Sequence, residues 1–154
     1  MAALLRELDA VRDRPHAHRL ALDRYAMMRP QLLAYERALR PVLSALDGAK
    51  PVLGAIHDMN GPSVAALVRL EGHLSRLEPL LATLGPPDDL ADVQATVLSA
   101  LHLAMEACKR RRLAIAANSI ALTREASASA AGAGMLADSA RQNLVALLFP
   151  PVVR

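Results

Sequence analysis

Apolar residues recur along most of the chain at intervals of three and four, the spacing of one face of an α-helix. The pattern is clearest after Ser63, where six leucines alternate between the two spacings: Leu67, Leu70, Leu74, Leu77, Leu81 and Leu84. Such spacing is typical of the a/d seam of a coiled coil, and Ser63 is a suitable N-cap for the helix that carries it. Strand-like alternation is absent from the rest of the sequence, so the pattern predicts an all-α protein.

Turn-forming residues divide the C-terminal two thirds into helices. Asn60-Gly61-Pro62 precedes the leucine-rich helix, and Gly85-Pro86-Pro87 follows it. Another helix is expected to begin at Asp88. A break between residues 118 and 123 should separate it from a last helix, about residues 124–148, because one uninterrupted helix would far exceed its partners in length.

Prolines interrupt the N-terminal third. A short amphipathic helix, residues 2–13, is expected to end near Arg14, since Pro15 suits the first position of a following helix. That following helix should kink at Pro30 and Pro41, because the apolar spacing continues through both. Asp47-Gly48 is expected to end it, with Gly48 as a left-handed cap, before a short segment of residues 51–58.

These elements predict one domain of residues 1–154, an up-down antiparallel bundle. It should have four main helices, the first long one proline-kinked, and one or two short accessory helices. The composition agrees, because 53% of the residues are apolar and aromatic side chains are confined to Tyr25, Tyr35 and Phe149. Residues that favour strands are correspondingly scarce.

The charge pattern indicates a cytoplasmic protein without a transmembrane segment. The net charge is only +3, and Glu7 and Asp9 interrupt the first apolar residues, unlike in a signal peptide. Arg124 and Glu125 likewise interrupt the longest weakly polar stretch, residues 113–137. Cys108 has no second cysteine to pair with and falls on an apolar stripe, so we expect a buried, unreactive thiol.

Four consecutive basic residues form the main electrostatic feature: Lys109, Arg110, Arg111 and Arg112. They fill one helical turn, so some of them must face solvent, where they could bind an anionic partner. A solvated helix end is the competing interpretation. Few aromatic residues and a modest net charge argue against nucleic acid as that partner.

Metal and haem sites have weak support. His102 and Glu106 are four residues apart and could supply two metal ligands, although a surface ion pair explains the spacing equally simply. Met27, Met28 and Met105 could bind haem together with His102, but methionine at helical spacing is more often core filler. We therefore predict no cofactor.

No catalytic or nucleotide-binding motif occurs in the sequence. We predict a non-catalytic protein of interaction, assembly or regulation, with a protein partner or a second copy. The alternative is a bundle that binds a small ligand, haem or a metal. The candidate interaction surface is the leucine seam together with the C-terminal Phe149, Val152 and Val153, which would form an apolar interface if left uncovered.

Small residues recur on the last helix at spacings of three and four, namely Ala126, Ala130, Ala133 and Ala137. Such a face lets another helix approach closely. We expect that neighbour to belong to the same chain.

Overall fold

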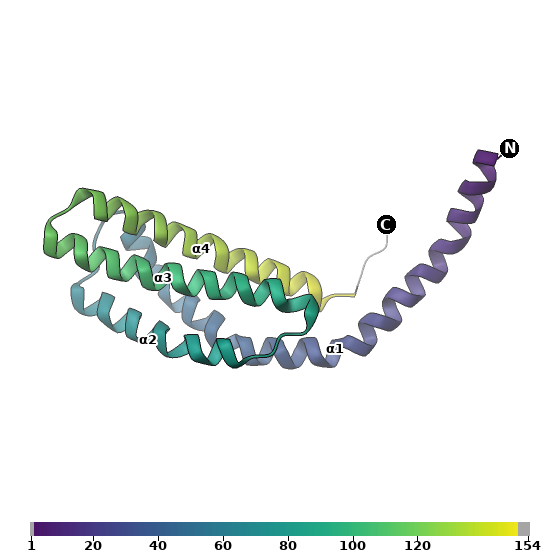
Figure 1. Cartoon of the computed structure of the whole chain (residues 1–154), viewed down its shortest axis with the longest axis horizontal. Helices are drawn as coiled ribbons and strands as arrows, with labels where there is room; N and C mark the ends of the chain where they lie inside the picture. The colour runs from purple at the N-terminus through teal and green to yellow at the C-terminus, as the bar shows by residue number, and fades with distance from the viewer. Residues whose placement is uncertain (1, 151–154) are drawn as a thin grey trace.

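Four α-helices run alternately up and down in the computed structural model (Figure 1). The structure describes the backbone of residues 2–150 and the side chains of residues 15–150. Within this range the elements are α1 (Ala2–His57), α2 (Val64–Thr83), the 3₁₀ turn η1 (Asp88–Leu90), α3 (Ala91–Ala117) and α4 (Ile120–Leu148), and no strand occurs. The predicted all-α bundle is thus confirmed.

The leucine-rich helix begins where the sequence predicts. Ser63 caps α2, because its hydroxyl accepts a hydrogen bond from the backbone N–H of Ala66 at 3.2 Å. Four of the six seam residues are buried, while Leu70 and Leu84 are half-buried: the buried ones are Leu67, Leu74, Leu77 and Leu81. The seam therefore packs into the core of its own chain, mainly against α3.

A tight turn joins α3 to α4. Asn118 adopts a left-handed conformation (φ 47°) that ends α3, and the Ser119 hydroxyl caps α4 by accepting a hydrogen bond from Leu122 N–H. The predicted break is confirmed, although α4 begins at Ile120 rather than near Arg124. The small residues expected to face a neighbour in the same chain are buried: Ala126, Ala130, Ala133 and Ala137.

Two predicted boundaries in the N-terminal third are wrong, because α1 is one helix from Ala2 to His57. It does not break near Arg14, nor does it end at Asp47-Gly48. No glycine of the described residues has a positive φ, so Gly48 does not form a left-handed cap.

The prolines within α1 all lie on its exposed side: Pro15, Pro30, Pro41 and Pro51. On that side, the carbonyl that loses its backbone partner can bind water instead. The opposite side is an apolar seam, whose residues recur at three and four and are buried: Leu32, Tyr35, Leu39, Val42, Leu46, Ala49, Leu53 and Ile56. Packing on this seam holds the helix together through the prolines.

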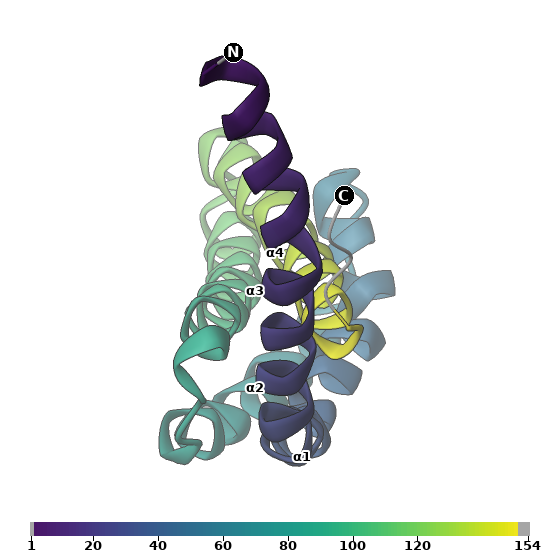
Figure 2. The ribbon, with the colours of Figure 1, turned by 90° about the vertical axis from the view of Figure 1, so that its right-hand side faces the viewer.

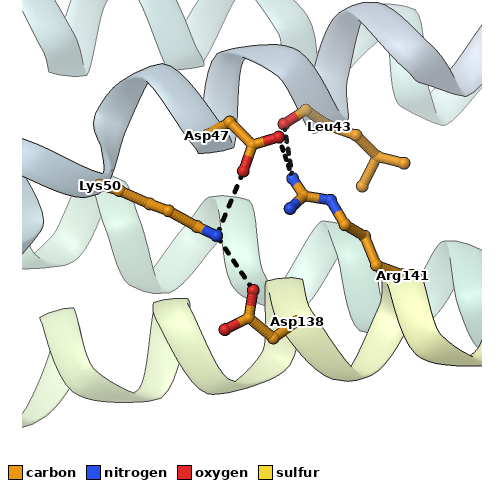
Figure 3. A network of polar contacts seen from close by, with 5 residues as sticks. All are labelled: Leu43, Asp47, Lys50, Asp138 and Arg141. Atoms are coloured by element: carbon orange, nitrogen blue, oxygen red, sulfur yellow. Dashed lines mark hydrogen bonds and ion pairs between the residues drawn. The ribbon is translucent and has the colours of Figure 1, made fainter.

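A polar network fastens α1 to α4 (Figure 3). Arg141 contacts the Asp47 carboxylate at 2.6 Å and also donates a hydrogen bond to the carbonyl of Leu43 at 3.0 Å. Lys50 bridges Asp47 at 3.2 Å and Asp138 at 3.1 Å. The network lies at the surface, where it fixes the register between the two helices.

The first part of α1 leaves the bundle altogether. We call residues 2–20 the arm; it projects past the end of the bundle at which α3 begins and α4 ends (Figures 1 and 2). The remainder of α1 packs against the other three helices. Among the described residues, no helix combines the length and the apolar character needed to cross a membrane.

Candidate functional site

An apolar pocket of about 290 Å³ lies where α1 leaves the bundle. Three elements line it, and we call it the end pocket: Ala21, Arg24, Tyr25, Met28 and Leu32 from α1, Asp89 from η1, and Ala146, Leu147 and Phe149 from the end of α4. Its walls are mainly aliphatic and aromatic. Arg24 and Asp89 place one charge of each sign among them.

The α1 wall of the end pocket continues the buried seam of that helix. Ala21, Tyr25 and Met28 precede Leu32 with the same alternation of three and four residues, so all four lie on one face. Inside the bundle, α3 and α4 cover this face, whereas Ala21, Tyr25 and Met28 are only half-buried. The apolar seam of α1 is therefore longer than the bundle that covers it.

The end of α4 is held against this wall by a hydrogen bond. Tyr25 donates its hydroxyl proton to the carbonyl of Leu148, one of the last-turn carbonyls that a helix leaves without an internal partner. Leu147 and Phe149, on either side of Leu148 in the sequence, line the pocket together with Met28. Phe149 itself is 65% exposed, which leaves a large aromatic side chain at the rim.

The basic turn at residues 109–112 is largely paired with carboxylates. Arg110 contacts both Glu106 and Glu125, and Arg112 contacts Glu71 at 2.6 Å. The hydrogen bond that Arg110 donates to the Glu106 carboxylate raises the pKa of Arg110 further above its ordinary value.

Arg111 instead packs under the turn between α1 and α2. It donates to the Thr123 hydroxyl at 3.2 Å, and a Cβ at Gly61 would lie too close to its guanidinium. Lys109 is exposed. The four basic side chains therefore lie in three different surroundings. Arg110 and Arg112 form ion pairs, Arg111 lies beneath the turn, and Lys109 faces solvent.

The two candidate metal ligands, His102 and Glu106, each pair with a different side chain. His102 Nε2 lies 2.6 Å from Glu78 on α2, while Glu106 pairs with Arg110 at 2.7 Å. Across the part of the chain that the structure describes, no group of three or more His, Cys, Asp or Glu side chains is placed to hold a metal ion. Of the methionines proposed as haem ligands, Met27 is 77% exposed, and Met28 lines the end pocket.

Cys108 is fully buried between the helices, as its place on the apolar stripe predicts. Burial raises the pKa of its thiol to about 11, and the nearby Glu71 carboxylate adds to that effect. The thiolate needed for nucleophilic chemistry is therefore disfavoured at neutral pH.

The predicted interaction residues separate into three groups. The leucine seam lies in the core and Phe149 lies at the end pocket, whereas Val152 and Val153 fall outside the described residues. The sequence analysis did not identify the α1 side of the pocket, although the spacing of apolar residues indicated it. The three-four spacing from Ala21 to Ile56 is unbroken, but Pro30 and Pro41 were interpreted as kinks and Asp47-Gly48 as a helix end.

Comparisons with known proteins found no match to this chain, so the geometry of the end pocket guides the inference of function. No family model, no curated protein and no solved structure matches the chain. The end pocket joins an uncovered apolar seam, an exposed aromatic residue and two opposite charges in one place.

Proposed function

We propose that the chain is a non-catalytic interaction module, acting in assembly or regulation, whose partner inserts a helix into the end pocket. One observation carries this proposal: the apolar seam of α1 continues past the point where the bundle stops covering it. Covering apolar surface that is exposed to water lowers the free energy of the system, so such a surface favours the binding of a partner.

The form of the pocket favours a helix as the occupant. Two helices, α1 and α4, supply its long walls, and amphipathic helices commonly dock into such grooves through apolar side chains three, four and seven residues apart. Arg24 and Asp89 provide polar groups beside the apolar centre, an arrangement typical of protein interfaces.

The energetics require contacts beyond the pocket itself. Burying one large apolar side chain contributes about 1.5–3 kcal/mol, whereas association costs roughly 4–15 kcal/mol in lost freedom. Two or three side chains in the pocket would therefore bind only weakly. Neighbouring exposed apolar residues, Leu20, Met27 and Val145, enlarge the surface that a partner can cover.

A small apolar ligand is the second candidate for the same pocket. Its volume of about 290 Å³ is just below the range of roughly 300–1,000 Å³ usual for small-molecule sites. The exposed Phe149 favours a protein, because a small molecule would leave much of that ring in water.

Site-specific photo-cross-linking in the cells that make the protein would test the proposal. A photoreactive phenylalanine analogue replaces Phe149 in one variant and Met135 in a control. Both residues are exposed and belong to the same C-terminal segment, but they are 14 residues, or about 21 Å, apart. We expect adducts with a protein of defined mass from position 149 and not from position 135.

Other outcomes decide between the alternatives. If position 149 formed adducts with a small molecule, the proposal of an interaction module would be rejected in favour of a ligand-binding bundle. Equal adducts from both positions, or none from either, would contradict both functions of the end pocket.

A further inference from the structure

A second pocket lies at the end of the bundle opposite the arm, beside the turn that joins α3 to α4 (Figure 1). Its volume is about 280 Å³, and we call it the turn pocket. We propose that the turn pocket binds a small phosphate monoester through the guanidinium of Arg111. This site is separate from the end pocket and gives a role to part of the basic turn at residues 109–112.

Arg111 is the arginine of the basic turn that the fold leaves without a counter-ion. Arg110 and Arg112 contact carboxylates, whereas no carboxylate of the described residues forms an ion pair with Arg111. A guanidinium carries five N–H donors. Here Nη1 donates to the Thr123 hydroxyl, but the buried Nε has no acceptor among the described residues. Because buried donors in native proteins nearly always have a partner, this one indicates a place for an ion or a water molecule.

The neighbours of Arg111 hold its guanidinium at the pocket. Nη1 donates to the Thr123 hydroxyl at 3.2 Å, and that hydroxyl donates in turn to the carbonyl of Ser119 at 3.0 Å. The turn between α1 and α2 also lies against the guanidinium, where Gly61 leaves the space that a Cβ would occupy. A cation held in this way loses little further freedom when it binds an anion, so the site is preorganised.

The walls of the turn pocket favour negative charge. They come from the end of α3 and the start of α4 and include Arg111, Ile115, Asn118, Ser119, Ile120 and Thr123. Among the described residues that line this pocket none is acidic, and the first turn of α4 contains no acidic residue either. The partial positive charge at the start of a helix adds to the charge of Arg111. The local field therefore favours an anion over a neutral ligand.

The size and the apolar walls of the pocket select the kind of anion. Ile115 is 43% exposed and Ile120 is 70% exposed, so apolar surface borders the guanidinium. The volume lies just below the roughly 300–1,000 Å³ usual for small-molecule sites. A planar guanidinium also matches the geometry of phosphate oxygens. A phosphate group on a small apolar substituent suits these walls, with its oxygens toward Arg111 and its substituent on the two isoleucines.

Amide NMR on the isotope-labelled full chain would locate the site. The probes are phenyl phosphate, inorganic phosphate and phenol, compared at constant ionic strength. We expect phenyl phosphate to shift the backbone amides of residues 118–123 and to reach saturation. Inorganic phosphate should shift the same amides at higher concentrations, because it lacks the apolar group. Phenol, which lacks the charge, should leave them in place.

Two charge-removing variants would separate the site from the net charge of the chain. Arg111→Gln should raise the Kd for phenyl phosphate about tenfold or more, because the ligand loses its charged donor. Lys109→Gln is the matched control, since it removes the same charge from an exposed side chain that does not line the pocket. Arg111→Lys keeps the charge but not the planar fork, so its Kd should fall between those of the wild type and Arg111→Gln.

The side-chain Nε–Hε signals of the wild type provide a measurement that needs no variant to fold. Phenyl phosphate should shift the signal of Arg111. The signal of Arg110 is the internal control, because its Nε already donates to Glu106 at 2.7 Å. Equal shifts of both signals would indicate general attraction to basic side chains and would overturn the site.

Equal weakening of phenyl phosphate binding by Arg111→Gln and Lys109→Gln would also overturn it. So would phenol binding as tightly as phenyl phosphate, because the pocket would then be an apolar site that does not use the guanidinium. None of these outcomes bears on the end pocket, whose proposed function depends on the cross-linking from position 149.

Discussion

Tyr35 and Gln94 form a partly buried hydrogen-bond chain that joins three helices. The Tyr35 hydroxyl donates to Gln94 Oε1 at 2.6 Å, and Gln94 Nε2 donates to the carbonyls of Leu81 and Leu84 at 3.1 Å each. Those carbonyls belong to Leu81 in the last turn of α2 and to Leu84 at its C-cap, and the Leu81 carbonyl also accepts a hydrogen bond from the Leu84 N–H at 3.2 Å.

Replacing Tyr35 by phenylalanine should lower the free energy of unfolding by about 1–2 kcal/mol, because Gln94 Oε1 would lose its buried donor. Urea denaturation would measure the change. Tyr25→Phe is the comparison, and its loss should be smaller, since the Leu148 carbonyl lies at the end of α4 where water can replace the hydroxyl. Equal losses would contradict this account of Tyr35.

Burial of two acidic groups predicts sensitivity to alkali. Burial raises the pKa of Cys108 to about 11 and that of Tyr35 to about 12. As the pH rises above about 9, the unfolded chain releases these protons first and binds fewer protons than the native chain, so stability falls with pH.

The free energy of unfolding should be about 2–3 kcal/mol lower near pH 10.5 than near pH 8. Urea denaturation at the two values would measure it. Cys108→Ala should remove most of the difference, because the thiol ionises first in the unfolded chain. A difference that survives in Cys108→Ala would show that other groups cause it.

Two glycines inside helices have room for a methyl group. Gly48 in α1 and Gly72 in α2 have no atom within 4 Å of the position that a Cβ would occupy. Replacing either by alanine should stabilise the protein by about 0.5–1 kcal/mol, because glycine loses more backbone freedom in a helix. Thermal unfolding would show a higher Tm. Gly132→Ala is the control and should gain less, since its Cβ would lie 3.0 Å from Leu103 Cδ1.

At the scale of elements, the network between α1 and α4 should contribute modestly to stability (Figure 3). Partial burial opposes ionisation of Asp47, but hydrogen bonds from Arg141 and Lys50 outweigh it and lower its pKa. Its stabilisation is thus present near neutral pH and is lost as acid protonates the carboxylate.

Asp47→Asn should destabilise the protein by less than about 1 kcal/mol, because the network is exposed to solvent. Chemical denaturation at neutral pH and at about pH 3 would measure the effect, which should shrink as the pH falls through the lowered pKa of Asp47. Glu36→Gln is the control, since its partner Arg40 belongs to the same helix and the pair joins no two elements. A loss of the same size in Glu36→Gln would contradict a role in fastening α1 to α4.

The sequence predicts best those helix ends that depend on local chemistry. Ser63 begins α2 and Asn118 ends α3, because a cap is set by the residue at the boundary and its near neighbours. The boundaries within α1 were predicted wrongly, since burial of residues such as Ala49 and Leu53 outweighs the local preferences of Gly48 and Pro51.

Sequence patterns could not predict the end pocket, for a different reason. Its walls come from three segments, residues 21–32, Asp89 and residues 146–149, which only the packing of the bundle brings together. Sequence spacing could have identified the α1 wall alone. The exposed Phe149 was selected as an interaction residue, but its neighbours across the pocket depend on the tertiary fold.

At the scale of the whole molecule, the arm and the bundle should differ in stability. A helix of about 19 residues without tertiary contacts is marginal in water, whereas α3 is covered by the other three helices. Amide hydrogen exchange should be fast in residues 2–20 of a dilute sample and slow in α3. Equal protection of residues 2–20 and of α3 would contradict this difference in stability.

Because α1 is one continuous helix, the arm keeps a fixed rotation and distance relative to the end pocket. Each residue inserted between them turns the arm by about 100° and advances it by about 1.5 Å relative to the pocket. Seven inserted residues restore the phase to within about 20° and lengthen the helix by about 10 Å. Whole heptads inserted there would thus move the arm outward while nearly keeping its rotation, and would leave the bundle unaltered.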